Sequence, residues 1–210
     1  DGYTIMLAAA ANIVGRQYLV KNQTYDAIKS FSPIAKIADT VLVIITPANS
    51  PFNSMKDVVE FAKKNPNKIS YGTSGIGTNH HLSAEVIRLM TGIDWVHVPY
   101  KGSGPAMADL LGGHVKLMMD STASALTAIK DGRIKALAVT TSRPAPGLEK
   151  VPSIGATVPG YDSAGWSGLV APAKTPDDIV AKVNADLVAL MRDPAIIRQF
   201  DERATLADPD

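Results

Sequence analysis

Cysteine is absent from this 210-residue chain, and aromatic residues make up only 6% of it. The lack of cysteine excludes disulfides, thiol nucleophiles and thiolate metal sites. Few aromatic rings leave little surface on which nucleic-acid bases could stack. The formal charge is only +1, from 21 Lys and Arg against 20 Asp and Glu, so a strong basic excess is missing too. We therefore expect a small molecule or a protein as partner, and no nucleic acid.

Long apolar runs are also missing. None approaches the about 20 residues that a membrane helix needs. The longest candidate, Ile5–Val14, is interrupted by Asn12. Only Asp1 precedes it among the charged residues, whereas a signal peptide needs a basic start. We predict a buried strand and a loop at this position, and no signal peptide in this chain.

Strand-like and helix-like segments alternate through the middle of the chain. The expected strands are 3–7, 41–46, 68–71, 95–98, 115–119, 134–139 and 166–172. The expected helices begin at Ser54, Asn79, Pro105, Ser121 or Thr122, Thr175 and Asp193. Residues 142–165, which are rich in proline and glycine, are expected to form a long ordered connection. The alternation predicts an α/β fold with a mostly parallel sheet covered on both faces.

The segment Tyr71–His81 is a strand-to-helix turn dense in glycine and hydroxyl groups. A phosphate loop would need Lys where Thr78 stands, and a dinucleotide fingerprint would need Gly where His80 stands. A nucleophile elbow around Ser74 would need Gly at position 76, which is Ile. Each of these three enzyme motifs therefore fails at a specific residue.

A more general property of this turn remains. Glycines let the backbone approach a ligand, and the free amides at a helix N-terminus point toward negative charge. Ser74 and Thr78 add hydroxyl donors. The turn is suited to hold a carboxylate without transforming it. A purely structural turn followed by a capped helix remains an alternative.

The histidines do not have the spacing of metal ligands. His80 and His81 are adjacent on a predicted helix, so their side chains diverge by about 100°, whereas a zinc pair normally lies one turn apart. His97 and His114 have no carboxylate at a ligand spacing. We expect no metal and no cofactor, and we expect His81 to face back and order the glycine-rich turn.

Polar residues also follow two further predicted strands. Tyr100 and Lys101 come after the strand at 95–98, and Asp120 and Ser121 come after the strand at 115–119. The carboxyl edge of such a sheet is where ligands of α/β proteins usually bind. A transferase-type enzyme using Lys101, or a histidine with Asp120, is an alternative, but the sequence offers no convincing pair of nucleophile and base.

A set of short segments, in this order and spacing, covers nearly the whole chain. They are Asp1-Gly-Tyr-Thr; Phe31-Ser-Pro-Ile; Tyr71-Gly-Thr-Ser-Gly-Ile-Gly-Thr; His97-Val-Pro-Tyr-Lys-Gly; Pro105-Ala; Asp109-Leu-Leu; Lys135-Ala-Leu-Ala-Val-Thr; Val151-Pro-Ser; and Trp166-Ser-Gly-Leu-Val-Ala-Pro. Together they resemble the extracytoplasmic solute receptors of tripartite tricarboxylate transporters, the Bug or TctC-like family. Each segment alone is a weak signal, and the set is highly specific.

This resemblance implies two α/β lobes that close on a ligand in a cleft, as in type II periplasmic binding proteins. Residues 47–167 would form one lobe, and residues 1–46 and 168–210 the other. Two hinge segments would cross between them, near Val41–Thr46 and Gly168–Ala171. Family members carry further elements before the start and beyond the end of this chain, so we expect it to be truncated at both ends.

The resemblance also implies a small carboxylic acid as ligand, held by backbone amides and hydroxyl groups. Residues 74–78 would hold one carboxylate, residues 100 and 120–121 would shape the other side, and residues 9–10 would approach from the first lobe. The full expected set is Ala9, Ala10, Ser74, Gly75, Gly77, Thr78, His81, Tyr100, Asp120 and Ser121.

The expected function is a monomeric periplasmic receptor, with no catalytic residues, that delivers a small carboxylate to the membrane permease of its transporter. A receptor-like module that signals to a partner without transport is an alternative, as is the transferase-type enzyme considered above.

Overall fold

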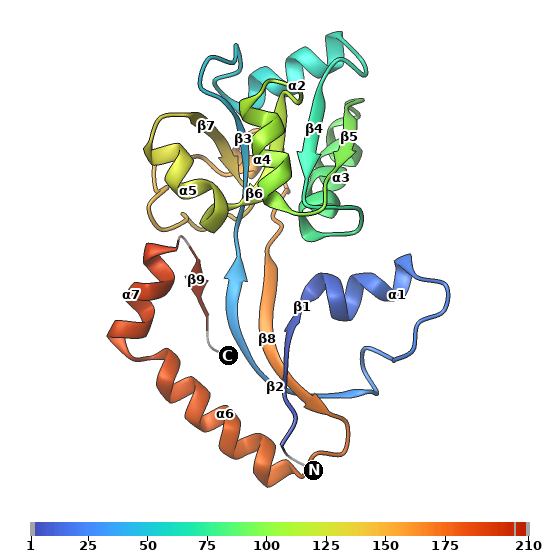
Figure 1. Cartoon of the computed structure of the whole chain (residues 1–210), viewed down its shortest axis with the longest axis vertical. Coiled ribbons are helices and arrows are strands. Elements are labelled where there is room, and N and C mark those ends of the chain that lie inside the picture. The colour runs from blue at the N-terminus through green and yellow to red at the C-terminus, as the bar shows by residue number, and fades with distance from the viewer. Residues whose placement is uncertain (1–2, 204, 209–210) are drawn as a thin grey trace. The chain divides into compact units, whose positions relative to one another are not determined.

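The computed structural model describes residues 3–203 and 205–208. The first two residues of the Asp1-Gly-Tyr-Thr segment lie outside these ranges. The chain forms two compact units. We call residues 1–40 and 165–210 the terminal unit, and residues 41–164 the central unit. Figure 1 labels the helices and strands of both units.

The sheet of the terminal unit is entirely antiparallel, with the strand order β1-β8-β2-β9. Its strands are β1 (Met6–Ala9), β2 (Phe31–Thr40), β8 (Gly165–Pro172) and β9 (Leu206–Ala207). A single π-helical turn, η1 (Ala11–Gly15), leads into α1 (Arg16–Leu19), and the later helices are α6 (Asp177–Met191) and α7 (Pro194–Glu202). Val180, Val183 and Leu187 of α6 pack against Ile34, Ala35 and Ala171 of the sheet.

The strand expected at 3–7 begins later and is less buried than predicted. β1 starts at Met6, and it pairs only with β8 among the described residues. Leu7 is 67% exposed and Ile5 is 51% exposed. Later in the apolar run Ile5–Val14, Ala8 and Ile13 are buried, at 1% and 6% exposed. The prediction of a buried strand is therefore wrong for the first residues of the segment.

β2 was not predicted, because two β-bulges break its side-chain alternation. Its register against β8 shifts between Pro33 and Ala35 and again between Lys36 and Ala38. Each bulge inserts a residue and moves the following side chains to the other face of the strand. Gly168 permits this close pairing, since a Cβ atom there would lie 2.6 Å from the Ala35 carbonyl oxygen.

The central unit has a mixed five-stranded sheet with the order β5-β4-β6-β3-β7. Its strands are β3 (Leu42–Pro47), β4 (Ser70–Thr73), β5 (Val96–Pro99), β6 (Leu117–Ser121) and β7 (Ile134–Val139). β5, β4 and β6 are parallel neighbours, whereas β3 is antiparallel to both β6 and β7. The expectation of a mostly parallel sheet is correct for β5, β4 and β6 and wrong at β3.

Three of the four helices described in the central unit begin where the sequence predicts, and the one expected at Pro105 begins two residues earlier, at Ser103. The four helices are α2 (Met55–Lys64), α3 (Asn79–Thr91), α4 (Ser103–Leu111) and α5 (Thr122–Lys130), with one 3-10 turn, η2 (Ile154–Ala156). The Ser54 hydroxyl accepts a hydrogen bond from the Asp57 N–H at 3.1 Å, and the Asp57 carboxylate accepts one from the Ser54 N–H at 3.0 Å. This reciprocal capping box satisfies two amides that the helix itself cannot pair.

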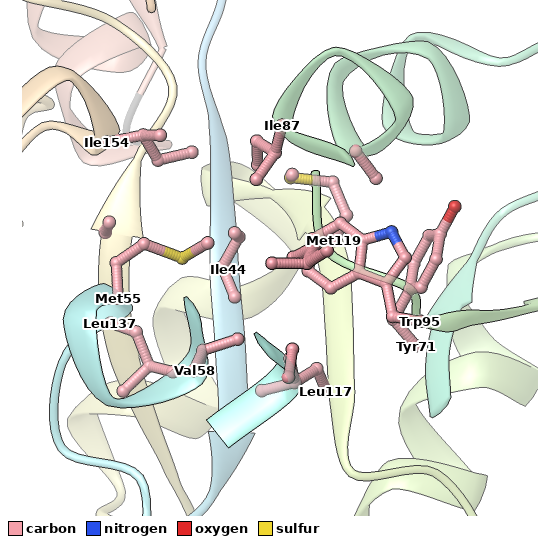
Figure 2. Packing of buried hydrophobic residues seen from close by; sticks show 14 of the residues in the cluster. Ile44, Met55, Val58, Tyr71, Ile87, Trp95, Leu117, Met119, Leu137 and Ile154 are labelled. Atoms are coloured by element: carbon pink, nitrogen blue, oxygen red, sulfur yellow. The ribbon is translucent and has the colours of Figure 1, made fainter. Parts of the chain in front are cut away.

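The core of the central unit lies between the sheet and its helices. Figure 2 shows Ile44 of β3 and Leu117 of β6 among the buried side chains of this cluster. Tyr71 of β4 and Trp95 have ring centroids 4.6 Å apart. The buried Tyr71 hydroxyl donates a hydrogen bond to Glu85 on α3, 2.9 Å away, so this large ring enters the core without leaving its hydroxyl unpaired.

The chain passes from one unit to the other at residues 40–41 and 164–165. These positions come before the expected boundaries at 46–47 and 167–168. Strand pairing gives the reason: β3 belongs to the central sheet, and β8 belongs to the terminal sheet. The two segments expected as hinges are thus strands, each inside a single sheet.

Candidate functional site

Three segments meet at the carboxyl edge of β5, β4 and β6. The first is the β4 turn, which we define as residues 74–78, the second is the loop at 100–102, and the third is the end of β6 at Asp120. Parallel neighbouring strands end at the same edge of a sheet, so these segments are brought together by topology. The Tyr100 N–H donates to the Thr73 carbonyl at 3.0 Å, and the Gly102 N–H donates to the Ser74 carbonyl at 3.2 Å.

Glycine is required at two positions of the β4 turn. Gly75 has a φ of 140° and Gly77 a φ of 76°, in the region where a side chain is strained. The Thr78 hydroxyl donates to the Gly75 carbonyl at 2.8 Å, and it accepts the His81 N–H at 3.4 Å as the cap of α3. The hydroxyl of Thr78, which we expected to face a ligand, already donates its hydrogen inside the turn.

The beginning of α3 leaves backbone donors beside this turn. Asn79 and His80 are the first two residues of the helix, so their N–H groups have no acceptor within it. The helix dipole places partial positive charge at the same end. Ser74, Gly75 and Gly77 are partly exposed. These groups together form a local environment that favours an anion.

His81 contacts the turn as the sequence predicts. Its Nδ1 atom accepts a hydrogen bond from the Gly77 N–H at 3.2 Å. The His81 ring stacks on His97 with 4.1 Å between ring centroids, and the His97 Nε2 atom lies 2.7 Å from the Thr73 hydroxyl. These contacts connect the turn to β5.

Tyr100 packs against the end of β4. A Cβ atom at Gly72 would lie 3.2 Å from the Tyr100 ring, so glycine makes room for the ring. The Tyr100 hydroxyl donates to Asp109 on α4 at 2.7 Å. Burial and the neighbouring Asp109 carboxylate raise the pKa of Tyr100 to about 12. The phenol thus remains neutral near pH 7, and its hydrogen is directed to Asp109.

A series of polar side chains links the β4 turn, the start of α3, the end of β6 and the start of α4. The Ser74 hydroxyl lies 2.8 Å from His80 Nδ1, and His80 Nε2 lies 3.8 Å from Asp120 Oδ1. Asp120 Oδ1 accepts hydrogen bonds from the Ser103 hydroxyl at 2.6 Å and from the Ser121 N–H at 2.8 Å. We call Ser74, His80, Asp120 and Ser103 the polar chain.

The polar chain contains two buried atoms without hydrogen-bond partners among the described residues: His80 Nε2 and Asp120 Oδ2. Burial raises the pKa of Asp120, and the hydrogen bonds from Ser103 and the Ser121 N–H oppose that rise. Burial lowers the pKa of His80. Unpaired buried polar atoms are costly, so their presence at a strand edge points to a functional site.

The expected residues fall into two groups by position. Eight of the ten lie at this edge of the central sheet: Ser74, Gly75, Gly77, Thr78, His81, Tyr100, Asp120 and Ser121. Ser121 caps α5 through the Ser124 N–H at 3.2 Å. Ala9 and Ala10 belong to the terminal unit, where Ala9 ends β1 opposite Ser167.

Sequence reasoning missed the roles of His80 and Ser103. Their positions in the sequence were the available signal, because Ser103 begins α4 shortly after β5 and Asp120 is the second-last residue of β6, at the same edge as the turn. Lys101, weighed for an enzyme, is exposed. Within residues 3–203 and 205–208, no three His, Asp or Glu side chains are grouped to hold a metal ion. No helix in the same residues is long and apolar enough to cross a membrane.

Comparison with known proteins extends these observations. A UPF0065 protein of Pseudomonas sp. (strain P51), encoded in the tcbD–tcbE intergenic region, is 33% identical over 204 residues, which cover 96% of this chain and 60% of that protein. The chain thus spans about 60% of the length of this curated relative.

Solved structures resemble the chain closely. One described as a periplasmic transporter has a TM-score of 0.88 and 36% identity, over 99% of this chain and 70% of that one. Rpa4515 of R. palustris, solved with adipate, has a TM-score of 0.89, 32% identity and the same coverage. MatC of Rhodopseudomonas palustris, solved with bound malate, has a TM-score of 0.83 and 25% identity, over 98% and 70%.

These likenesses confirm the two-unit α/β fold of a periplasmic binding protein that the sequence predicted. A model of the family described as "Tripartite tricarboxylate transporter family receptor" matches residues 1–205. The match extends over almost the whole chain. This protein belongs to the tripartite tricarboxylate transporter receptor family.

Proposed function

We propose that the protein is a periplasmic receptor that binds a small carboxylic acid and presents it to the membrane permease of a tripartite tricarboxylate-type transporter. The observation that carries this proposal is the partly exposed β4 turn at the N-terminus of α3, where hydroxyl and backbone donors converge. Such donors bind a carboxylate strongly, because hydrogen bonds to a charged group are roughly twice as strong as neutral ones. Two similar structures, solved with adipate and malate, support the ligand class.

In this proposal the ligand carboxylate lies on the β4 turn. Ser74 donates its hydroxyl hydrogen, and the N–H groups at the start of α3 add partial positive charge. Gly75 and Gly77 let the backbone approach the ligand. Asp120 and Ser121 lie beside this carboxylate site at the end of β6.

Ala9 and Ala10 of the terminal unit complete the proposed set of ligand-binding residues. The two passages of the chain between the units, at residues 40–41 and 164–165, are the proposed hinges. The closed arrangement of the receptor has the higher affinity for the ligand, so ligand binding stabilises it. Capture and release of the ligand therefore need no covalent step. In this proposal the receptor acts as a monomer.

Calorimetry against a panel of organic acids tests the proposal. We expect binding of at least one acid among malate, adipate and related mono- and dicarboxylates, and none of neutral sugars. Ser74→Ala removes one hydrogen bond to a charged group, which corresponds to about 1.5–3 kcal/mol, or roughly tenfold to hundredfold weaker binding.

Thr127→Ala, at an exposed position of α5, is the matched control and is expected to leave the affinity unchanged. Binding of sugars with no response to any acid would contradict the proposed ligand class. If the wild-type protein and Ser74→Ala bind the acid with equal affinity, the β4 turn is not part of the binding site.

A further inference from the structure

Ser74 and His80 share a single hydrogen-bond contact. The Ser74 hydroxyl oxygen and His80 Nδ1 are 2.8 Å apart, so one of the two must supply the hydrogen. If Ser74 donates, Nδ1 is unprotonated and the ring carries its hydrogen on Nε2. If His80 donates from Nδ1, the hydroxyl hydrogen of Ser74 is free to turn toward a ligand.

The ligand-free protein favours donation by Ser74. In that arrangement Nε2 bears the hydrogen and faces Asp120 Oδ1 at 3.8 Å, which places a donor toward an acceptor. Two donors, the Ser103 hydroxyl and the Ser121 N–H, converge on this oxygen and oppose the rise in the pKa of Asp120 that burial causes. Burial lowers the pKa of His80 and so favours its neutral ring.

A carboxylate bound at Ser74 reverses this preference. A carboxylate only accepts hydrogen bonds, so Ser74 must donate to it and must accept from His80 Nδ1. If the Nε2 hydrogen simply moved to Nδ1, the lone pair on Nε2 would face the Asp120 carboxylate. If the ring instead takes a proton from solvent, both nitrogens carry hydrogen, and the positive ring lies between Asp120 and the bound ligand.

The other titratable groups on the surrounding elements have partners of their own. Glu85 of α3 bonds to Tyr71 and Arg88, and Asp109 of α4 accepts from Tyr100. His81 accepts the Gly77 N–H and stacks on His97, which bonds to Thr73. Lys101, in the loop after β5, is exposed. Asp120 is thus the charged group that pairs with His80 in the polar chain.

We propose that binding of a carboxylate at Ser74 is coupled to the uptake of one proton by the His80–Asp120 pair. This inference rests on the proposed function, because it assumes an anion on the β4 turn. His80 acts as a positioning residue that releases the Ser74 hydrogen for the ligand. Binding then strengthens as the pH falls from about 8 toward 6, by up to about tenfold per pH unit where a full proton is taken up.

Calorimetry in two buffers measures the coupling directly. Malate and adipate are titrated into the full chain at pH 7 in HEPES and in Tris, whose ionisation enthalpies differ. The dependence of the binding enthalpy on the buffer gives the number of protons taken up, and we expect about one for each ligand bound. Binding without any proton uptake overturns the inference and leaves the proposed function intact.

Two variants identify where the proton goes. His80→Gln keeps an amide donor for Ser74 but cannot titrate, so we expect binding with no proton uptake and no dependence on pH. His114→Gln makes the same substitution at an exposed histidine and is expected to keep the uptake of the wild-type protein. Persistent uptake in a folded His80→Gln variant overturns the inference.

Nitrogen-15 NMR of the ligand-free protein provides a readout that needs neither variant nor ligand. A neutral His80 ring with its hydrogen on Nε2 at pH 7 supports the inference, and a doubly protonated ring overturns it. If neither acid binds, the proposed function fails for these acids. In that case the NMR spectrum still reports the protonation state of His80, on which the proposed coupling depends.

Discussion

The two sheets of this protein differ in strand direction, and their buried polar residues are distributed accordingly. Each neighbouring pair in the terminal sheet is antiparallel, whereas β5, β4 and β6 of the central sheet are parallel. Of the nine buried polar or charged residues in the described ranges, Asp39 and Thr175 belong to the terminal unit and seven to the central unit. Parallel strands direct successive loops to one edge, so polar groups gather there.

The units also differ in how deeply their cores are buried. Leu117 of β6 is 1% exposed inside the central cluster, whereas Leu187 of α6 is only partly buried on the terminal sheet. This contrast predicts that shortening a leucine side chain to alanine lowers the free energy of unfolding more in the central unit than in the terminal unit.

The largest expected effect is from Leu117→Ala. We expect the free energy of unfolding to fall by about 3 kcal/mol, because the substitution removes buried methyl groups and leaves a cavity. Leu187→Ala is the matched substitution in the terminal unit and is expected to lower it by about 1 kcal/mol. Urea unfolding measures both, and similar losses in the two variants would contradict the proposed difference in packing.

A second pair of substitutions tests the bulged pairing of β2 with β8. In Gly168→Ala the new Cβ atom would meet the Ala35 carbonyl oxygen at 2.6 Å, so the strands must shift and we expect a loss of about 2 kcal/mol. Gly104→Ala in α4 adds a methyl group where no atom lies within 4 Å, and it is expected to stabilise the protein by up to about 1 kcal/mol. Thermal unfolding distinguishes the two, and a neutral Gly168→Ala would show that β2 and β8 can move apart freely.

The smallest expected effects on the free energy of unfolding come from substituting one carboxylate in each unit. Glu85→Gln weakens bonds to Tyr71 and Arg88 in the central unit and is expected to lower the free energy of unfolding by about 1 kcal/mol. Asp186→Asn removes an exposed pair with Lys182 on α6, with an expected change below about 0.5 kcal/mol.

The effect of Glu85 also depends on pH. Burial acts to raise its pKa, but the hydrogen bonds from Arg88 and Tyr71 outweigh burial and lower it. The stabilisation is therefore present above the unfolded-state pKa of about 4.3, and it is lost as the pH falls through the lower pKa of the folded protein. Unfolding of the wild-type protein and Glu85→Gln at pH 7 and pH 3 checks this, and an unchanged difference between them would contradict it.

Local chemistry in the sequence predicts where many elements begin. Ser54 caps α2, Ser121 caps α5 and Asp193 caps α7, as the pattern of side chains indicates. The direction of β3 could not be predicted in the same way. A run of β-branched residues indicates that a segment is a strand, but the choice of partner and direction depends on residues far away in the chain.

Some features of the candidate site could likewise be predicted from the sequence, and others could not. The glycine-rich turn and the polar strand ends could be identified because glycine, hydroxyl and carboxylate residues follow predicted strands. The link through His80 could not, because it depends on the register that places Asp120 beside α3. The hydroxyls of Thr78 and Tyr100 illustrate the same limit, since their hydrogens are donated to acceptors that only the folded chain provides.

The passages of the chain at residues 40–41 and 164–165 have a consequence for biosynthesis. The central unit is one continuous stretch of sequence, so all of its strands emerge from the ribosome in succession and can pair at once. β1 and β2, made earlier, must wait for β8 before their sheet can form. The nascent chain therefore completes the loops of the candidate site while β1 and β2 are still without β8.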